Sequence, residues 1–514
     1  MKPMKPLQLS ILLPILVSAL FTPFETCATN LPPSDAEEDA SKGEAGENRD
    51  PMALNYHLMH PGGPSGPGDP NAAFHLDGTY HLHYIFKPEG TGYSACRYAH
   101  VTSPDLLHWT WQETKLRPSF TGHGMFSGTG FMTKEGKPAV IYHGQGSGRN
   151  WIAIAKNRDL SAWEKPYPVE VRNPDGSEAD MRRWVPDWFR LGDTYYAISG
   201  CKNPPLCKSK DLKNWTLVGD FLKQEPPDVA KGEDISCANF FPIGDRWMLL
   251  CISHPFGCRY YLGDWDATAE QFVPESHGRM SFEENDDADN RRAGQIFAPE
   301  SVRTADGRRV MWAWLRKGNP RGTVQTLPRE LSLGRDGTLR IGPARELESL
   351  RYDPDVFEDV TVQGEDRWNG GFARTRVTEL NGDAFEIRAV VSREQAERKR
   401  FGLRLFASDD RTGLPITIRP ERGTIQVGET AAPFAVADLP PDEDVELRVF
   451  IDKYIVEVFV NDRQAVIESD MEYTVGRGLD AYTWGAPTTF RSIEIWRMNP
   501  SNQGYLEAQK SLAY

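Results

Sequence analysis

One short motif recurs three times in this chain and limits the folds open to it. An Asp-Leu pair is followed, after two intervening residues, by Trp in Asp105–Trp109, Asp159–Trp163 and Asp211–Trp215, and successive copies lie a little over fifty residues apart. A repeat of fixed period is the signature of an architecture assembled from copies of one supersecondary unit, each packed on its neighbours. The motif therefore predicts a repeat fold.

The segments around these motifs indicate what the repeated unit is. Five of them, between about residues 55 and 345, combine a tight turn with a run of aromatic and β-branched residues, which is the pattern of short β-strands. They are "GDPNAAFHLDGTYHLHY" (68–84), "FSGTGFMTKEGKPAVIYHG" (126–144), "VPDWFRLGDTYYAISG" (185–200), "CANFFPIGDRWMLLCISH" (237–254) and "FAPESVRTADGRRVMWAWL" (297–315). Sheets of about four strands repeated five times close radially into a propeller. We therefore predict an all-β chain with a five-bladed β-propeller over residues 52–345, because a repeat-free β-sandwich would leave the motif unexplained.

The pattern changes after residue 345. Segments such as "VELRVFIDKYIVEVFVND" (445–462) alternate apolar and polar residues, as strands with one buried face do. Val445, Leu447 and Val449 share one face, and Val456, Val458 and Val460 repeat the pattern after a turn at Asp452-Lys453. Sheets of this kind pack in pairs. We therefore predict a linker at 346–354, a C-terminal β-sandwich at 355–500 and a tail at 501–514.

The first residues have the features of an export signal. Lys2 and Lys5 precede the apolar stretch "LQLSILLPILVSALF" (7–21), and small residues suit cleavage near Ala28. We predict a signal peptide at 1–28, an acidic and disordered leader at 29–51, and a secreted or periplasmic protein without a transmembrane span after signal removal. The alternative is that the apolar stretch is retained as a membrane anchor.

The charge and the cysteine content limit which ligands and crosslinks the chain can have. The net charge of −14 argues against a nucleic-acid partner and provides no basic surface for anionic lipids. Six cysteines follow the predicted signal, and Cys201 and Cys207 are the pair closest in sequence, so we expect a disulfide there. Cys237 and Cys251 lie in apolar runs and are expected to be buried thiols. No Cys-x-x-Cys pair occurs, and we predict no metal and no cofactor.

Acidic residues recur where the innermost strands of the predicted propeller begin. These strands start near the central axis, where a funnel can hold a ligand. The residues at these starts are Asp69 and Asn71, Phe126 and Ser127, Asp187, Glu233 with Asp234 and Asn239, and Glu300. Each acid taken alone is more simply a turn cap or a solvated charge. Several acids converging on one funnel suit glycoside hydrolysis, in which one carboxylate attacks and one acid protonates the leaving group.

Five segments resemble glycoside hydrolase family 32, the invertases, inulinases and levanases. "YHLMHPGGPSGPGDPNAAFHLDGTYHLHY" (56–84) resembles its opening motif. The others are "YAHVTSPDLLHW" (98–109), "FSGTG" (126–130), "QTLPREL" (325–331) and "VELRVFIDKYIVEVFVNDRQAV" (445–466). The resemblance covers about residues 55–500. It implies a five-bladed propeller, a β-sandwich and retaining hydrolysis of β-fructosides, with Asp69 as the nucleophile.

The chain also departs from the family pattern. The opening motif has Gly66-Pro67-Gly68 in place of Trp-Met-Asn, and Ala72 stands where its last Gly belongs. Val185 stands in the position of the acid that stabilises the transition state, and Asp187, two residues on and on the same strand face, is the expected replacement. Ser236 stands in the position of the proton donor, and a serine cannot protonate a leaving group near neutral pH.

Four acids remain as candidates for the missing proton donor: Glu233, Asp234, Glu300 and Asp187. Asp187 is better suited to stabilise charge and hold a sugar hydroxyl, because it replaces the neighbouring acid position. Asp234 shares a strand face with Ser236 and is ranked first. Glu233 is ranked second and Glu300 third. We therefore predict Asp69, Asp187, Asp234 and Glu233 as catalytic residues, and Asn71, Phe126, Ser127 and Glu300 as residues that bind substrate.

The sequence as a whole predicts a secreted glycoside hydrolase that acts on β-fructosides, either sucrose or inulin- or levan-type fructans, by a retaining double displacement. Its partner is then a small-molecule or oligosaccharide fructoside. Two alternatives remain open. One is a non-catalytic sugar-binding propeller, which Val185 and Ser236 favour. The other is a glycosidase for another furanoside, such as an arabinoside.

Overall fold

The chain folds almost entirely into β-strands. The computed structural model describes residues 50–63, 65–180, 184–283, 293–316, 323–364, 371–397, 400–408 and 412–511. The helices within them are short: α1 (Pro118–Thr121), α2 (Arg393–Ala396) and α3 (Gln503–Ser511), with 3-10 turns η1 (Tyr93–Ala95), η3 (Arg345–Leu350), η4 (Pro420–Arg422) and η5 (Val436–Asp438). No helix in this part of the chain is both long and apolar enough to cross a membrane. The all-β prediction is confirmed, while the predicted signal peptide (1–28) and nearly all of the predicted leader (29–51) lie outside the described residues.

Five small sheets follow one another between residues 70 and 343, and four of them have four strands. Sheet I contains β1 (Pro70–Leu76), β2 (Thr79–Phe86), β3 (Arg97–Ser103) and β4 (Thr110–Gln112). Sheet II contains β5 (Gly124–Met132), β6 (Pro138–Gln145), β7 (Arg149–Ile154) and β8 (Tyr167–Pro168). Sheet III contains β10 (Pro186–Leu191), β11 (Thr194–Ser199), β12 (Pro205–Ser209), β13 (Trp215–Asp220) and the added strand β9 (Val171–Arg172). Sheet IV contains β14 (Ser236–Ile243), β15 (Arg246–Ser253), β16 (Gly257–Asp266) and β17 (Gln271–Arg279). Sheet V contains β19 (Ile296–Arg303), β20 (Arg309–Leu315), β21 (Arg329–Leu333) and β22 (Leu339–Pro343).

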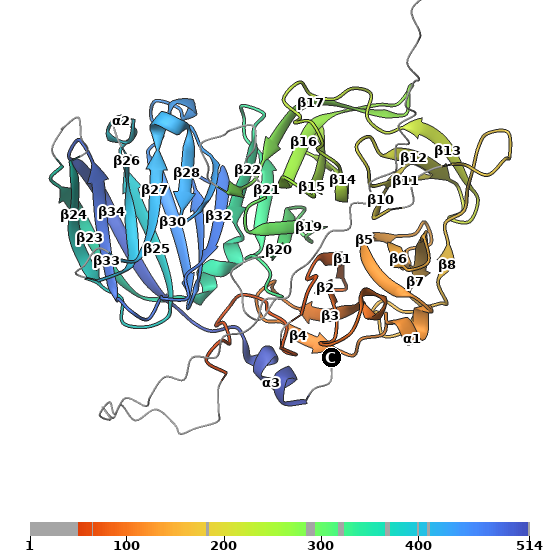
Figure 1. Cartoon of the computed structure of the whole chain (residues 1–514), viewed down its shortest axis with the longest axis horizontal. Coiled ribbons are helices and arrows are strands. Elements are labelled where there is room, and N and C mark those ends of the chain that lie inside the picture. Colours follow the sequence, from red (N-terminus) through yellow and green to blue (C-terminus); the bar gives the residue numbers. More distant parts are fainter. Residues whose placement is uncertain are drawn as a thin grey trace, which may run out of the picture. The chain divides into compact units, whose positions relative to one another are not determined.

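The first strands of the five sheets contact one another in a closed series. Strand β1 contacts β5, β5 contacts β10, β10 contacts β14, β14 contacts β19, and β19 contacts β1 again. In Figure 1 these five strands lie around a common centre, with the other strands of each sheet farther out. Residues at the starts of the first strands are therefore brought together from distant parts of the sequence.

Bulges interrupt these first strands near the centre. The pairing register shifts between Asn71 and Phe74, between Met125 and Gly128, between Ser236 and Asn239, and between Phe297 and Pro299. Ala72, Cys237 and Ala298, inside three of these bulges, have φ values of 39°, 47° and 48°. A bulge leaves one residue unpaired and turns the neighbouring side chains to a new direction. The bulges therefore turn polar side chains toward the centre.

The recurring Asp-Leu-x-x-Trp motif forms the connection between the third and fourth strands of sheets I, II and III. Its leucine has a left-handed backbone in each copy, with φ of 70° at Leu106, 58° at Leu160 and 63° at Leu212. The aspartate accepts hydrogen bonds from backbone N–H groups two or three residues on, as Asp211 does from Lys213 and Asn214. The motif is thus a repeated turn that anchors the outer strand.

The C-terminal part is a sandwich of two sheets. One contains β18 (Phe282–Glu283), β29 (Thr430–Pro433), β28 (Thr424–Val427), β27 (Leu414–Arg419), β26 (Arg400–Ala407), β33 (Gly478–Trp484) and β24 (Phe372–Glu379). The other contains β23 (Arg351–Val362), β34 (Thr488–Met498), β25 (Ala384–Val391), β30 (Val445–Asp452), β31 (Ile455–Val460) and β32 (Gln464–Ser469). Side chains of both sheets form one core that contains all six predicted residues: Val445, Leu447, Val449, Val456, Val458 and Val460. The predicted turn at Asp452-Lys453 connects β30 to β31, and this alternation is confirmed.

Three segments do not follow the predicted order of propeller, linker, sandwich and tail. Strand β23 begins at Arg351, within the range predicted as a linker, and helix α3 occupies most of the predicted tail and contacts β4 of sheet I. Strand β18, which precedes sheet V in the sequence, pairs with β29 of the sandwich. The first half of the chain and the sandwich are thereby connected at more than one point of the sequence.

The predicted disulfide between Cys201 and Cys207 is wrong. All six cysteines of the described residues are free thiols. The backbone of Cys201 forms an antiparallel β-bridge with Ile235, and its thiol donates a hydrogen bond to the carbonyl oxygen of Asn203 at 2.9 Å. Cys207 lies within β12 opposite Ala197, whose carbonyl oxygen accepts its thiol at 3.4 Å. Closeness in sequence misled the prediction because the two residues are held by different strand pairings.

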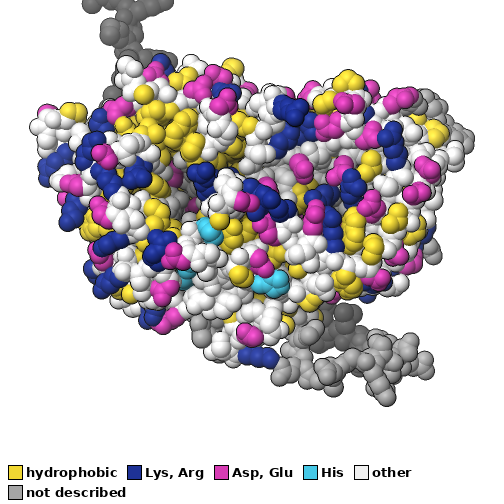
Figure 2. All heavy atoms as spheres, turned by 180° about the vertical axis from the view of Figure 1, so that it is seen from behind, with side chains coloured by type: hydrophobic (Ala, Val, Ile, Leu, Met, Phe, Trp, Pro, Cys, Tyr) yellow, Lys and Arg dark blue, Asp and Glu magenta, His cyan; other side chains and the backbone are white. Residues whose placement is uncertain are grey.

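Charges of both signs share the surface. Acidic residues exceed basic ones, 73 to 59, in the whole chain. Figure 2 shows acidic and basic side chains interspersed over the face that it draws. A polyanion on this face would meet carboxylates among the basic groups, which is unfavourable at close range.

Candidate functional site

The position of Asp69 is fixed by a close contact between sheets I and V. A Cβ atom added to Gly68 would lie 2.6 Å from Nε1 of Trp314 and 3.0 Å from Cγ2 of Thr323, so only glycine fits there. Gln325 donates from Nε2 to the carbonyl oxygen of Gly68 at 2.8 Å. The backbone of Asp69 is bonded as well, because its carbonyl oxygen accepts from the N–H of Ile85 at 2.9 Å. The glycine-rich approach therefore lets the chain pass tightly over Trp314 and holds Asp69 at the start of β1.

The Asp69 carboxylate is buried and lies against residues from two other sheets. Its Oδ2 accepts a hydrogen bond from Oγ of Ser127, in β5, at 2.5 Å, and Sγ of Cys237, in β14, lies 3.9 Å away. Burial raises the pKa of Asp69 to about 6, although the Ser127 hydrogen bond and the positive field of His254 oppose the shift. The result is a carboxylate that is ionised at neutral pH but poorly solvated, which suits a nucleophile.

Asn71 connects sheets I and II. Its Nδ2 donates to the carbonyl oxygen of Asp69 at 2.5 Å, and its Oδ1 accepts from the N–H of Gly128 at 2.9 Å. A Cβ at Gly128 would lie 2.0 Å from the carbonyl oxygen of Ile141, which explains the glycine of the "FSGTG" segment. The Asn71 side chain thus positions the backbone around Asp69 and Ser127, and its predicted contact with substrate stays a prediction.

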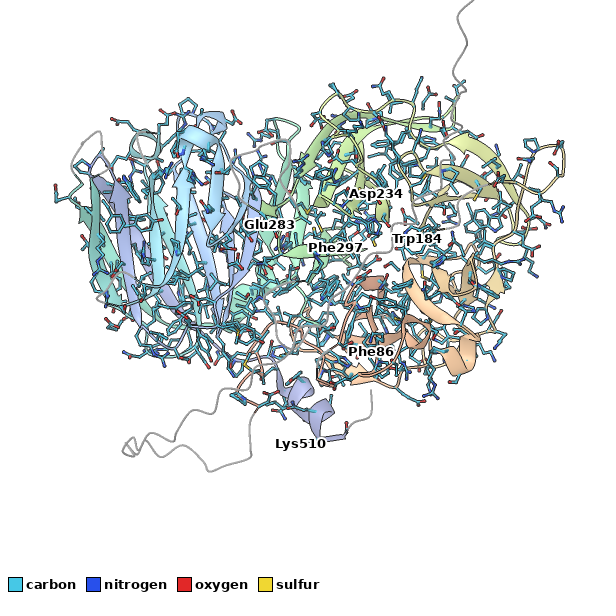
Figure 3. The ribbon with its side chains drawn as sticks, in the orientation of Figure 1. Phe86, Trp184, Asp234, Glu283, Phe297 and Lys510 are labelled. Atoms are coloured by element: carbon cyan, nitrogen blue, oxygen red, sulfur yellow. The ribbon has the colours of Figure 1, made fainter. Side chains whose placement is uncertain are left out.

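An aromatic row lies beside Ser127. The ring of Phe126 lies 5.7 Å from that of Tyr93 and 6.2 Å from that of Trp184, between centroids, and Trp184 lies 4.7 Å from His143. Figure 3 shows Trp184, Asp234 and Phe297 around the same central region, although Phe297 comes from sheet V and the other two precede sheets III and IV. Aromatic faces with a few placed polar groups are typical of small-molecule sites.

Asp187 and Glu300 are two further buried acids, and each has its own hydrogen-bond partners. Oδ2 of Asp187 accepts from the N–H of Phe240 at 2.7 Å, and Glu300 accepts from Oγ1 of Thr129 at 3.2 Å and from Nδ2 of Asn239 at 3.5 Å. Burial raises the pKa of Glu300 to about 8, and burial together with the charge of Glu300 raises the pKa of Asp187. Among the described residues, no hydrogen bond joins either acid to Asp69, so their predicted roles stay predictions.

Glu233 is held in a buried ion-pair cluster. It forms a direct ion pair with Arg259, Nη2 of Arg279 lies 3.7 Å from its Oε1, and its Oε2 accepts from the N–H of Ala230 at 2.7 Å. Two guanidinium groups favour the charged carboxylate over the protonated acid. This environment favours a structural role for Glu233 over the proton-donor role in which the sequence ranks it second.

Asp234 is bonded to the end of the neighbouring strand. Its Oδ2 lies 2.6 Å from Nδ1 of His254, and its Oδ1 accepts from the N–H of His254 at 2.9 Å and from Oγ of Ser253 at 3.1 Å. Burial would raise the pKa of Asp234, but the hydrogen bonds from His254 and Ser253 outweigh burial and lower the pKa. Asp234 therefore lies in the predicted region as an ionised carboxylate that orients a histidine.

Two positions that are acidic in the family pattern hold non-acidic residues here. Ser236 is fully buried, and Val185 is buried at the start of β10 with a φ of 30°. Positive φ is unusual for a β-branched residue and marks a strained backbone, which is common at functional sites. Any acid must therefore come from neighbouring positions.

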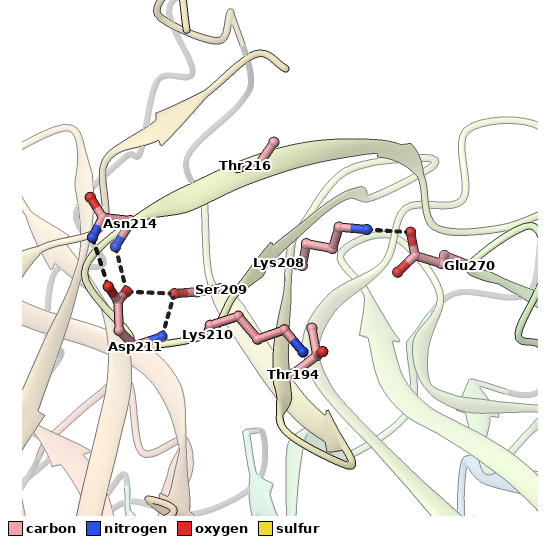
Figure 4. Close-up of a pocket in the computed structure, with 8 residues that line it drawn as sticks. All are labelled: Thr194, Lys208, Ser209, Lys210, Asp211, Asn214, Thr216 and Glu270. Atoms are coloured by element: carbon pink, nitrogen blue, oxygen red, sulfur yellow. Dashed lines mark hydrogen bonds and ion pairs between the residues drawn. The ribbon is translucent and has the colours of Figure 1, made fainter. Parts of the chain in front are cut away.

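A separate surface pocket of about 410 Å³ lies away from these residues, over sheet III. Figure 4 shows its lining: Thr194, Lys208, Ser209, Lys210, Asp211, Asn214, Thr216 and Glu270. Lys208 and Glu270 pair with each other at 2.6 Å, and Asp211 caps the turn before β13. None of the predicted site residues lines it, and we assign it no chemistry.

Three residues around Asp69 were not predicted as part of the site. Cys237 and Trp184 lie at strand starts, where the sequence reasoning considered mainly acids. His254 follows the second strand of the β14–β15 hairpin and lies at the same end of it as Asp234, and the sequence signal for it is a single histidine after the buried run of β15. A lone histidine of this kind can be recognised as a site residue only when the strand pairing is known.

Comparison with family models covers most of the chain. The model described as Glycosyl hydrolases family 32 N-terminal domain matches residues 67–343, and the model described as Glycosyl hydrolases family 32 C terminal matches residues 346–497. Together they span both the series of small sheets and the sandwich.

Curated relatives and solved structures agree with this match. The chain is 27% identical over 454 residues to a raffinose invertase of Escherichia coli, covering 80% of this chain and 89% of the relative. It is 24% identical over 481 residues to a levanase of Bacillus subtilis (strain 168), covering 83% of this chain and 68% of the levanase. Fructan 1-exohydrolase IIa from Cichorium intybus superposes with a TM-score of 0.69 at 18% identity, covering 88% of this chain and 98% of that one. Sucrose-6-phosphate hydrolase from Lactobacillus gasseri gives 0.68 at 18% identity, covering 88% and 94%. At this identity the two structures show a shared fold.

Proposed function

This chain belongs to glycosyl hydrolases family 32, and from that premise we propose that it hydrolyses β-fructosides such as sucrose and inulin- or levan-type fructans. The predicted family is confirmed, and the chain is a glycoside hydrolase by that membership. The relatives named as raffinose invertase and levanase support a β-fructoside as substrate. The observation in the molecule that carries the proposal is the buried Asp69 carboxylate, bonded to Ser127 beside an aromatic row.

The five sheets act, in this proposal, as five blades of a propeller. The closed series of contacts among β1, β5, β10, β14 and β19 supports it. So does the direct contact of Gly68 with Trp314, which closes sheet I against sheet V. An experimental structure with a sixth sheet in the series, or with an open gap between sheets I and V, would contradict this count.

Hydrolysis proceeds, in this proposal, by a retaining double displacement. Asp69 attacks the anomeric carbon and forms a covalent fructosyl ester, and water then releases fructose. The hydrogen bond from Ser127 to Oδ2 holds the Asp69 carboxylate in one orientation for the attack. Asp187 is proposed to stabilise positive charge on the sugar in its ionised form, and Glu300 is proposed to bind the sugar hydroxyls.

Two other functions retain specific support. A non-catalytic sugar-binding protein is favoured by the buried Ser236 and Val185, which replace two acids. A glycosidase for another furanoside is favoured because the aromatic row and the carboxylates do not by themselves distinguish fructose from arabinose.

A panel of substrates separates these functions. We expect the purified protein to release fructose from sucrose, inulin or levan and to leave arabinan intact, because the relatives named as raffinose invertase and levanase support a β-fructoside as substrate. Product formation is followed by chromatography. Arabinose release would support the other furanoside, and sugar binding without any product would support the binding protein.

Export is proposed on the basis of residues 1–28, which have the composition of a signal peptide. The protein is then secreted or periplasmic. The mature N-terminus tests this proposal, because cleavage near Ala28 is expected and an intact N-terminus on purified exported protein would support a retained anchor.

A further inference from the structure

The site lacks a proton donor at the position that the family pattern provides. Ser236 stands there and is fully buried, and Cys237 beside it lies against Oδ2 of Asp69. In the hairpin of β14 and β15, Ser236 pairs with Ile252. The hairpin therefore places residues just beyond Ile252 at the same end of sheet IV as Ser236.

His254 is the residue that this pairing brings to the site. Asp234 binds it twice, through Nδ1 at 2.6 Å and through its backbone N–H at 2.9 Å, and Ser253 donates to the same carboxylate. Because an ionised carboxylate only accepts hydrogen bonds, Nδ1 of His254 carries a proton, and Nε2 remains for exchange with a ligand. About half of the His254 side chain is exposed, so a ligand can reach it.

His254 also acts electrostatically on the nucleophile. Its positive charge lowers the pKa of Asp69, against the larger effect of burial. Its ring faces Phe297 edge-on, with centroids 6.1 Å apart, at the start of sheet V. Cys237, which contacts Asp69, and His254 thus lie at the same end of the hairpin of β14 and β15.

We propose that His254 is the proton donor and acceptor of the reaction, and that Asp234 is the positioning residue that orients it. This inference rests on the proposed function, a double displacement at Asp69. The sequence ranked Asp234 first as the proton donor. In this inference the proton donor is His254, and Asp234 holds it in place.

The two steps balance with His254 as the only proton carrier. In the first step, Asp69 forms a C–O bond to the anomeric carbon, the glycosidic C–O bond breaks, and the Nε2 proton of the imidazolium passes to the leaving oxygen. In the second step, neutral Nε2 takes a proton from water while the water oxygen bonds to the anomeric carbon. The ester bond to Asp69 then breaks and the imidazolium is restored.

A second Asp–His pair in the chain provides a matched control. His108 has its Nδ1 2.7 Å from Oδ2 of Asp105 and its N–H 2.9 Å from Oδ1 of the same residue, and its side chain is also about half exposed. This pair lies in the turn before β4, within the Asp-Leu-x-x-Trp motif. It has the same local geometry without the nucleophile beside it.

The test compares leaving groups in His254→Asn. Because sucrose needs a protonated leaving oxygen, its kcat/KM should fall by about 10²–10⁴-fold. The first-turnover release of nitrophenol from a p-nitrophenyl β-fructofuranoside should fall less than about 10-fold, since nitrophenolate leaves without a proton. Asp234→Asn should show the same selective loss, and imidazole added to His254→Ala should restore part of the sucrose activity. His108→Asn should match the wild type for both substrates.

Each result decides a separate claim. Selective loss with sucrose in His254→Asn, together with imidazole rescue in His254→Ala, supports the inference. If the wild type releases fructose and His254→Asn keeps its sucrose activity, or loses both activities equally, the inference is overturned and the proposed function stands. If the wild type cleaves no β-fructoside at all, the proposed function falls first and the inference falls with it.

Discussion

Replacing Asp69 with Asn should abolish fructose release, with kcat/KM for sucrose reduced by about 10⁴-fold or more, as for loss of other covalent nucleophiles. Asn has nearly the same shape as Asp but cannot form the fructosyl ester. The hydrogen bond from Ser127 and the backbone contact at Gly68 can both remain, so the fold should be preserved. The loss should be equal for sucrose and for an aryl fructoside, because both need the nucleophile.

Asp77 is the matched control for this variant. It lies in the turn after the same strand, is exposed, and pairs with Arg158 at 2.8 Å on the surface. Asp77→Asn should leave turnover unchanged. Initial rates for the two variants, with circular dichroism to confirm folding, check the prediction. Near-normal activity in Asp69→Asn would reduce Asp69 to a turn residue and remove the basis of the mechanism.

Replacing Glu457 with Gln should lower the free energy of unfolding by about 3–5 kcal/mol, the usual cost of breaking a buried ion pair by removing one partner. Glu457, in β31 of the sandwich, pairs with Arg329 of sheet V at 2.7 Å and lies 3.5 Å from His57. His57 also pairs with Asp452 at 3.0 Å, and all four side chains are fully buried. Two positive and two negative groups balance, and losing one carboxylate leaves buried positive charge unpaired.

This cluster should also make stability depend on pH. Burial would lower the pKa of His57, but hydrogen bonds to Asp452 and Glu457 raise it from 6.5 to about 9. A raised pKa means that the folded state holds the proton more tightly, so the stabilisation is complete below pH 6.5 and is lost as pH rises through about 9. The pKa values of Asp452 and Glu457 are lowered, so their contribution is lost instead in acid.

Urea unfolding followed by tryptophan fluorescence measures both effects. Glu164→Gln is the control, because Glu164 pairs with Lys137 at 3.4 Å with both side chains about half exposed. A surface pair of this kind contributes less than about 1 kcal/mol. Equal losses in the two variants, or a wild-type stability that does not fall between pH 6.5 and 9, would contradict the account of the cluster.

The fold was predictable where local pattern determines structure. The two-residue alternation of Val445, Leu447 and Val449 identified a buried strand face, because neighbouring side chains of a strand point to opposite sides. The Asp-Leu-x-x-Trp motif marked a repeated connection, because its capping aspartate and left-handed leucine act within a few residues. Such features need no knowledge of long-range contacts.

The site was predictable only in part, for the opposite reason. The sequence identified Asp69 and Ser127, and the structure brings them into contact. It ranked Asp234 and Glu233 by strand face, but their chemistry depends on partners about twenty or more residues away. Arg259 and Arg279 neutralise Glu233, and His254 bonds Asp234 across a hairpin. The register of pairing between strands decides these contacts, and the local pattern around Asp234 and Glu233 does not reveal which distant residues that register brings to them.

The most direct test of the central claim is to identify the covalent intermediate. Turnover of a p-nitrophenyl β-fructofuranoside by the wild-type protein is quenched in acid, and the protein is digested and analysed by mass spectrometry. The account predicts one fructosyl group in ester linkage on the peptide that contains Asp69, and no such adduct in Asp69→Asn. A fructosyl adduct on another carboxylate, or nitrophenol release by Asp69→Asn at the wild-type rate, would contradict it.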